Sequence, residues 1–415
     1  MTTTQPCGCP DYQSATMSRR SLLGGAVLAG GVLSLSGPGY AVAASTSVAA
    51  QRSLTGSVLV LLSLRGAADG LSLVVPHGDP VYYSARPRIA VPHSTLLVPD
   101  AMFGLHPAMH PLLDLWNSGR LAAVHASGMP VANRSHFSAM EEIEDASPGS
   151  RERSGWLNRL LGQLPGASPL QGIAMGSQPP ASMFGTEPTF VANRVEDSSV
   201  AGADDKGRRL ASLAHAWAGN GRLQRAARDA VAGAQAFAPA EEVTLGAPTP
   251  AYPKTSLGEA LGQASRIIRA QIGAEVLTVD QGDWDMHTDM GTIEWGEMQR
   301  NAADLAGSIA AFFADLGPAA ERVTLVTLSE FGRRVRENDQ WGTDHGHGNV
   351  MLLAGAGVRG GYHGTWPGLA DTDDADVRVT TDYRSVLTEV VGRRFGVSPA
   401  AVFPGFTPSP VGVMG

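Results

Sequence analysis

Carboxylates and imidazoles gather in two short stretches of this sequence. Both stretches mix acidic and histidine side chains at close spacing: Asp283, Asp285 and His287 in the first, and Asp344, His345 and His347 in the second. Oxygen and imidazole ligands suit zinc, manganese, magnesium or calcium. We therefore predict a divalent metal site, with zinc or manganese as leading candidates and calcium or magnesium as alternatives. The alternative for the first stretch is a solvated loop.

Two further carboxylates follow apolar runs that are typical of strands. Asp69 comes shortly after residues 58–64, and Glu330 comes directly after residues 323–328. Asp69 could be a metal ligand or, because a glycine follows it, an ordinary turn residue. Thiolate ligands are not expected, because the two cysteines, Cys7 and Cys9, lie in the N-terminal leader.

Ser135 is a candidate nucleophile, flanked by Arg134 and His136. A serine–histidine pair of hydrolase type is disfavoured, because the side chains of adjacent residues usually point apart. A serine activated by metal coordination fits better, with Arg134 holding the oxygens of an anionic ester substrate. The other histidines, His77, His106, His110 and His125 among them, are left as structural or surface residues.

The elements that position these residues alternate along the chain. Apolar runs at residues 58–64, 121–125, 276–279, 323–328 and 350–353 predict strands, and helical spacing of apolar residues predicts helices over 257–268, 305–316 and 382–395. Alternating strands and helices favour an α/β fold, a doubly wound and mostly parallel sheet with helices on both faces. Ligands bind at the carboxyl ends of such strands. Residues 185–253 show no convincing strand and are interpreted as an insertion or cap.

The N-terminus has the features of a twin-arginine signal peptide. Arg19 and Arg20 precede an uncharged apolar stretch, residues 22–35, which is too short to span a bilayer stably, and small residues at 41–43 suit a signal peptidase. We expect residues 1–43 to be cleaved, residues 44–55 to be a linker and residues 56–415 to form the exported domain. The expected export partners are the twin-arginine translocase and signal peptidase; the alternative is an uncleaved membrane anchor.

Composition limits the classes of partner. The 415 residues have a net charge of −8 and are 43% hydrophobic, so the chain can bury a large core and lacks the basic charge of a nucleic-acid-binding protein. After residue 43, we expect no membrane span.

Five motifs resemble those of an exported bacterial family, the domain-of-unknown-function 1501 family, placed with the alkaline phosphatase and sulfatase superfamily. They are residues 64–71 (LRGAADGL), 134–137 (RSHF), 282–287 (GDWDMH), 329–333 (SEFGR) and 343–349 (TDHGHGN). The resemblance implies an alkaline phosphatase-like sandwich with one or two divalent metals and a Ser, Thr or modified Cys nucleophile. It implies these positions for the site: Asp69 as a ligand, Ser135 as nucleophile, Asp285 with His287 as a ligand pair, and Asp344, His345 and His347 to complete it.

Two positions depart from the family pattern. Asp283 stands where glycine is usual, and Glu330 with Phe331 replaces the Asp-His ligand pair of phosphatases and sulfatases, which depletes one metal position. The leading hypothesis is an exported metal-dependent hydrolase of phosphate or sulfate esters. The alternative is a non-catalytic metal-binding or assembly protein on the same scaffold.

Overall fold

A computed structural model describes residues 56–148, 154–166, 168–198, 212, 215–219 and 221–415. The expected signal peptide and linker, residues 1–55, lie outside the described residues, as does part of the expected cap. No described helix is long and apolar enough to cross a membrane.

The strands form one large sheet and a small two-stranded one. The large sheet contains β1 (Val58–Leu64), β4 (Leu121–Gly128), β5 (Gly172–Met175), β6 (Phe190–Ala192), β7 (Val276–Gln281), β8 (Val323–Leu328), β9 (Asn349–Gly355), β10 (Gly361–His363) and β11 (Thr381–Asp382). The small sheet pairs β2 (Val74–Val75) with β3 (Gly104–Leu105).

The strand order is β10-β4-β9-β8-β1-β7-β5-β6, and β11 pairs with β4. β1 is central and runs parallel to both β7 and β8, whereas β9 is antiparallel to β8 and β4. The remaining pairs in this sheet are parallel. The predicted mostly parallel α/β sheet is therefore confirmed.

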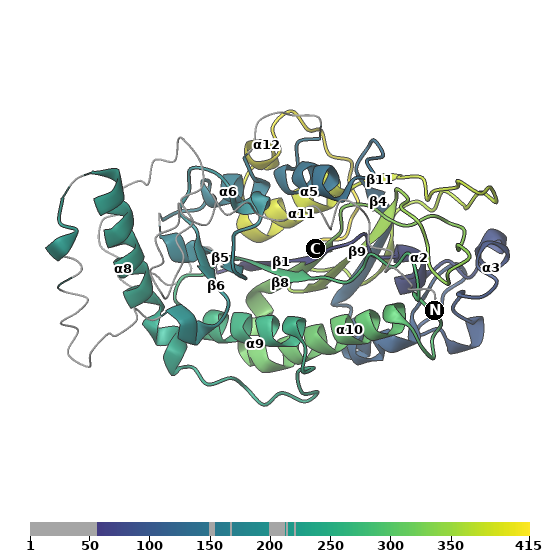
Figure 1. The fold of residues 1–415 in the computed structure, drawn as a ribbon, viewed down its shortest axis with the longest axis horizontal. Helices are drawn as coiled ribbons and strands as arrows, with labels where there is room; N and C mark the ends of the chain where they lie inside the picture. Colours follow the sequence, from purple (N-terminus) through teal and green to yellow (C-terminus); the bar gives the residue numbers. More distant parts are fainter. Residues whose placement is uncertain (1–55, 149–153, 167, 199–211, 213–214, 220) are drawn as a thin grey trace, which may run out of the picture.

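Helices cover both faces of the sheet (Figure 1). They are α2 (Gly70–Leu73), α3 (Pro80–Ala85), α4 (Leu113–Asn117), α5 (His136–Asp145), α6 (Trp156–Leu161), α8 (Arg222–Glu242), α9 (Ser256–Arg269), α10 (Glu297–Leu316), α11 (Tyr383–Phe395) and α12 (Pro399–Val402). Helices α9 and α10 lie on one face, and α5, α6, α11 and α12 lie on the other.

Side chains of β1 alternate between two cores, as the two-residue period of a strand requires. Val60 and Leu62 pack with α9 and α10, and Leu59 and Leu61 pack with α6 and α11. All seven residues of β1 are buried, which explains the uninterrupted apolar run. This rigid centre holds the ends of β1, β7 and β8 side by side.

Helix α9 shows how local sequence sets these elements. Its N-cap residue Thr255 accepts a hydrogen bond from the backbone N–H of Gly258. Leu257, Leu261 and Ile268 then recur on the buried face.

The expected cap region contains one strand and one long helix among its described residues. β6 extends the sheet at its edge next to β5, and α8 stands at one end of the molecule, at the left of Figure 1. The strand differs from the expectation of none there, because three residues are too few to show a strand pattern in the sequence.

Candidate metal centre

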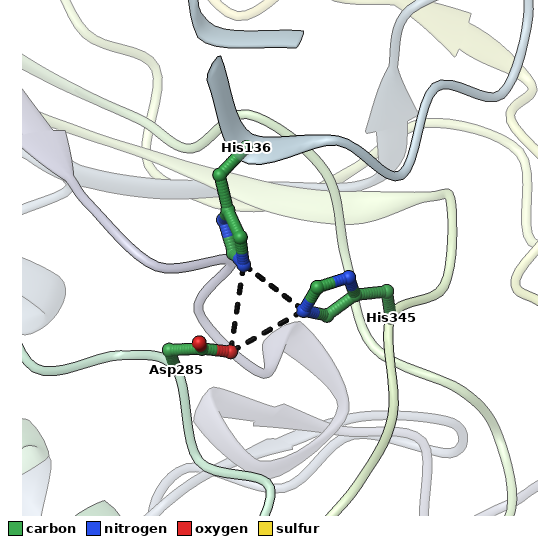
Figure 2. A group of neighbouring side chains, drawn as sticks. All are labelled: His136, Asp285 and His345. Atoms are coloured by element: carbon green, nitrogen blue, oxygen red, sulfur yellow. Dashed lines mark hydrogen bonds and ion pairs between the residues drawn. The ribbon is translucent and has the colours of Figure 1, made fainter. Parts of the chain in front are cut away.

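Three side chains from distant parts of the chain meet beyond the carboxyl ends of β7 and β8. His136 is the first residue of α5, Asp285 lies in the loop after β7, and His345 lies in the loop between β8 and β9. Figure 2 shows their ring nitrogens and carboxylate oxygen pointing toward one another. The group could hold a metal ion.

The distances within this group match one face of a zinc tetrahedron. Nε2 of His136 lies 2.9 Å from Nε2 of His345 and 3.5 Å from Oδ1 of Asp285. Nε2 of His345 lies 3.3 Å from the same Oδ1. Zinc–ligand bonds of about 2.0–2.1 Å in a tetrahedron separate the ligand atoms by about 3.3 Å. The three atoms are therefore spaced to bind a common ion.

The outward nitrogens of both imidazoles face acceptors, which fixes their tautomers. Nδ1 of His136 lies 2.8 Å from Oε1 of Glu330, and Nδ1 of His345 lies 3.0 Å from the carbonyl oxygen of Arg134. Because a carbonyl or carboxylate oxygen can only accept, each Nδ1 donates its hydrogen. In the neutral rings, each Nε2 then presents a lone pair to the centre, the usual arrangement of metal-binding histidines.

His287 repeats this pattern at the edge of the group. Its Nδ1 lies 2.9 Å from Oδ1 of Asp344. Its Nε2 lies 2.9 Å from Nε2 of His345 and 3.1 Å from Oδ1 of Asp285. His287 thus contacts two of the three central residues and presents a third lone pair toward them.

Lone pairs of three imidazoles and one carboxylate repel one another unless a cation lies between them. In the protein without metal, protons take that role. Burial opposes the charged form of His136, but hydrogen bonds to Asp285 and Glu330 outweigh it and raise its pKa to about 9. Burial likewise opposes the charged form of Asp285, but hydrogen bonds from His136, His287 and His345, together with Arg333, hold its pKa far below the usual range.

Two buried charged residues, Arg333 and Glu330, hold members of the cluster in place. Arg333 donates from Nη2 to Oδ1 of Asp285 at 2.7 Å and to the carbonyl oxygen of Trp284 at 2.9 Å. Glu330, 2% exposed, accepts from the backbone N–H of Gly66 at 2.9 Å. Gly66 has φ +109°, and a Cβ there would lie 2.6 Å from the backbone nitrogen of Asp285, so glycine is required.

A family model described as "Protein of unknown function (DUF1501)" matches residues 57–403. The chain belongs to the DUF1501 family. No curated protein matches the chain. The match covers β1 and every residue of the cluster, so the candidate metal centre lies within the family domain.

Asp69 of this DUF1501 protein lies in an ion pair away from the cluster. Nη1 of Arg86 lies 2.5 Å from one carboxylate oxygen of Asp69, and Nη2 lies 3.0 Å from the other. Ser72 donates to the same carboxylate at 2.7 Å. Both partners of the ion pair are buried, so the carboxylate is already satisfied by charge and by hydrogen bonds.

Four other predicted ligands do not belong to the group of three: Glu330, Asp344, His347 and Asp283. Glu330 and Asp344 contact the outer nitrogens of His136 and His287, so they orient ligands. His347 directs Nε2 to the carbonyl oxygen of Met129 at 2.8 Å. Asp283 is exposed, and its carbonyl oxygen accepts from Asn301 at 2.7 Å.

Ser135 is the exposed N-cap residue of α5, and its side chain makes no capping hydrogen bond. Its two neighbours both contact the cluster: the carbonyl of Arg134 holds His345, and His136 is a member. Ser135 therefore lies between two residues that contact the cluster, at the N-terminus of α5.

Sequence reasoning gave no metal role to His136 or Arg333. The sequence suggests His136 only as a partner of Ser135, because His136 lies far along the chain from the two stretches of Asp and His residues. The available signal was its position before the helical stretch that follows β4, since strand ends meet at one edge of the sheet.

A cleft of about 650 Å³ lies beside the cluster. Its lining residues are all polar, and most of them carry a charge: Arg134, His287, Arg334, Arg336, Glu337, Asn338, Asp339, Asp344, His345, Asp373 and Asp374. Arg134 and Arg334 both contact the carboxylate of Asp376. His345 of the cluster and the neighbouring His287 line this cleft, so the cluster can be reached from it.

Proposed function

We propose that the chain is an exported, metal-dependent hydrolase of phosphate or sulfate esters, with Ser135 as the nucleophile. The observation that supports it most is the convergence of His136, His345 and Asp285 at tetrahedral spacing, with the exposed Ser135 next to His136 in the sequence. Two imidazoles and one carboxylate are a donor set of catalytic zinc sites, so zinc is the proposed metal.

The chain's own residues have separate tasks in this proposal. The oxygen of Ser135 forms the bond to phosphorus or sulfur as the ester bond to the alcohol oxygen breaks, and the serine proton passes through water to the departing alcohol oxygen. A water oxygen then bonds to phosphorus or sulfur as the bond to Ser135 breaks, and a proton of that water returns to the serine oxygen. Arg134 binds the anion's oxygens after leaving Asp376. A bound divalent metal would lower the pKa of the Ser135 hydroxyl and neutralise charge on the equatorial oxygens of the phosphate or sulfate group.

The test combines metal analysis with turnover of aryl phosphates and aryl sulfates. We expect about one zinc per chain and turnover that Ser135→Ala reduces by at least about a thousandfold, the scale seen when a nucleophile is removed. Ser138→Ala is the matched control, because Ser138 is an exposed serine one turn further along α5. Undiminished turnover in Ser135→Ala contradicts the nucleophile assignment.

N-terminal sequencing of the exported protein is expected to give Ala44 as its first residue.

The second candidate function is metal binding without catalysis. It is favoured by the pairing of Asp69 with Arg86, which leaves the position after β1 without a ligand for a second metal. Stoichiometric zinc with no turnover of any ester would support this candidate.

A further inference from the structure

Two tryptophans lie exposed and in contact with each other. Trp295 is 43% exposed and Trp341 is 36% exposed, and their ring centroids lie 5.6 Å apart in an edge-to-face arrangement. Both belong to turns in the chain beyond β7 and β8. Contiguous exposed aromatic surface beside a cleft is typical of a binding site.

The turn that presents Trp341 is locked to the cluster. The side-chain oxygen of Asn338 accepts from the backbone N–H groups of Gln340 and Gly342, and its amide donates to the carbonyl of His287 at 2.9 Å. A Cβ at Gly342 would lie 2.2 Å from that carbonyl oxygen. The backbone next to Trp341 therefore lies directly against the residue that lines the metal centre.

Trp341 itself adopts a costly conformation. Its φ is +60°, a left-handed value that bulky side chains rarely take. Such strain is concentrated at functional sites. A folded protein gains little from an exposed indole at this position, so the residue type is better explained by a ligand than by stability.

A second turn brings Trp295 to the same place. Gly291 and Gly296 have φ of +78° and +110° and pack tightly against each other, and the carbonyl of Trp295 accepts from Thr292 at 2.8 Å. The backbone N–H of Gly291 donates to the carbonyl of Trp341 at 3.1 Å, so the two turns are joined.

Arg88 supports the ring of Trp341. Its guanidinium carbon lies 5.0 Å from the centroid of the ring, and Nε lies 2.5 Å from Oε1 of Glu337, which lines the cleft. The cation fixes the indole by attraction to its face. The exposed part of the indole is left for a ligand.

The cleft next to this pair offers hydrogen-bond acceptors. Asp339, Asp373 and Asp374 line it, while the positive charge of Arg334 is paired with Asp376 and that of Arg336 with Asp371 and Asp373. Carboxylates accept from hydroxyl groups and cannot donate when ionised. Exposed indole surface with acceptors beside it complements a ring that carries hydroxyl groups, whereas an extended polyanion would be repelled.

We propose that Trp341 and Trp295 bind the alcohol part of the ester substrate, and that this part is a sugar ring that packs against their exposed indole surface. The inference rests on the proposed function, whose phosphate or sulfate group it places at the metal centre. The substrate is then a sugar phosphate or a sugar sulfate.

The binding test needs no turnover. Methyl glycosides of glucose, galactose and mannose are titrated against the purified protein by calorimetry and tryptophan fluorescence. At least one is expected to bind, about tenfold more weakly to Trp341→Gly and to Trp295→Ala, the change expected from losing one aromatic contact. Trp341→Gly should fold at least as well as the wild type, because glycine relieves the positive φ. Leu245→Ala, which removes an equally exposed apolar side chain outside the cleft, should bind normally.

A kinetic test then separates the two proposals. Glucose 6-phosphate and glucose 6-sulfate are compared with ethyl phosphate and ethyl sulfate, and Trp341→Gly should lower kcat/KM about tenfold for the sugar esters alone. Glycoside binding without cleavage of any ester overturns the hydrolase and leaves the sugar site standing. Wild type that binds no glycoside, variants that bind as tightly as wild type, or preference for phenol over every glycoside overturns the sugar site.

Discussion

Asp69 and Asp285 begin from similar places and end in different roles. Each follows a strand of the central sheet, and each contacts a buried arginine. Arg86 occupies both oxygens of Asp69, and the pair is sealed from solvent. Arg333 donates to one oxygen of Asp285, and three histidines approach that same oxygen.

The difference lies in what balances the negative charge. A guanidinium that donates to both oxygens of a carboxylate neutralises its charge and satisfies its hydrogen-bonding capacity. Such a carboxylate has little affinity left for a metal ion. At Asp285, one guanidinium contact leaves the carboxylate 29% exposed at its side chain and surrounded by imidazoles that also need a cation. The first carboxylate stabilises the fold, and the second is available for chemistry.

Replacing Asp285 with asparagine should have the largest effect on the metal. The neutral amide contributes no charge, so we expect stoichiometric zinc to be lost, with affinity reduced by at least about a hundredfold, beyond the range for changes that only orient a ligand. Zinc content after dialysis measures the loss. Asp283→Asn is the matched control, because Asp283 is exposed two residues away. Full zinc retention in Asp285→Asn would break the comparison.

Replacing Asp69 with asparagine should act on stability instead. Arg86 would remain buried without its charge partner, and removing one partner of a buried ion pair costs about 3–5 kcal/mol in the free energy of unfolding. Zinc content of the folded fraction should not change. Urea unfolding measures the cost, and adding Arg86→Met should restore part of it because the uncompensated charge is gone. A stable Asp69→Asn protein that has lost its metal would mean that Asp69 is a ligand.

The central strands of the large sheet could be predicted from the sequence, because each of them appears there as a local apolar run. The predicted runs 58–64 and 323–328 coincide with β1 and β8. The other three predicted strands lie within β4, β7 and β9. The gathering of Asp285 with His345 also followed from strand ends that meet at one edge.

The partners of the candidate ligands were not predictable in this way. Arg86 lies outside every motif, so nothing in the sequence indicated that it neutralises Asp69. His136 joins the cluster because α5 begins beside the ends of β7 and β8, a long-range packing result. Such choices are made by tertiary contacts between residues far apart in sequence, which local patterns do not encode.

Without metal, the stability of the protein should depend on pH through the histidines that contact Asp285. The folded pKa of His136, about 9, lies above its usual 6.5, so its contribution is fully present below pH 6.5 and is lost as pH rises through 9. His136 alone should lower the free energy of unfolding of EDTA-treated protein over this range by at most about 3 kcal/mol. The pKa of His287 is also raised, by its hydrogen bond to Asp285, and acts in the same direction.

Zinc should reverse this slope, because the metal binds the deprotonated imidazoles and protons compete with it less as pH rises. Glu330→Gln should flatten the metal-free slope, since Glu330 is one of the two carboxylates that raise the pKa of His136. Urea unfolding between pH 6.5 and 9.5, with EDTA and with zinc, measures both. If the metal-free slope is flat in the wild type, protons do not replace the metal at Asp285. The cluster would then be held together by Arg333, as Asp69 is by Arg86.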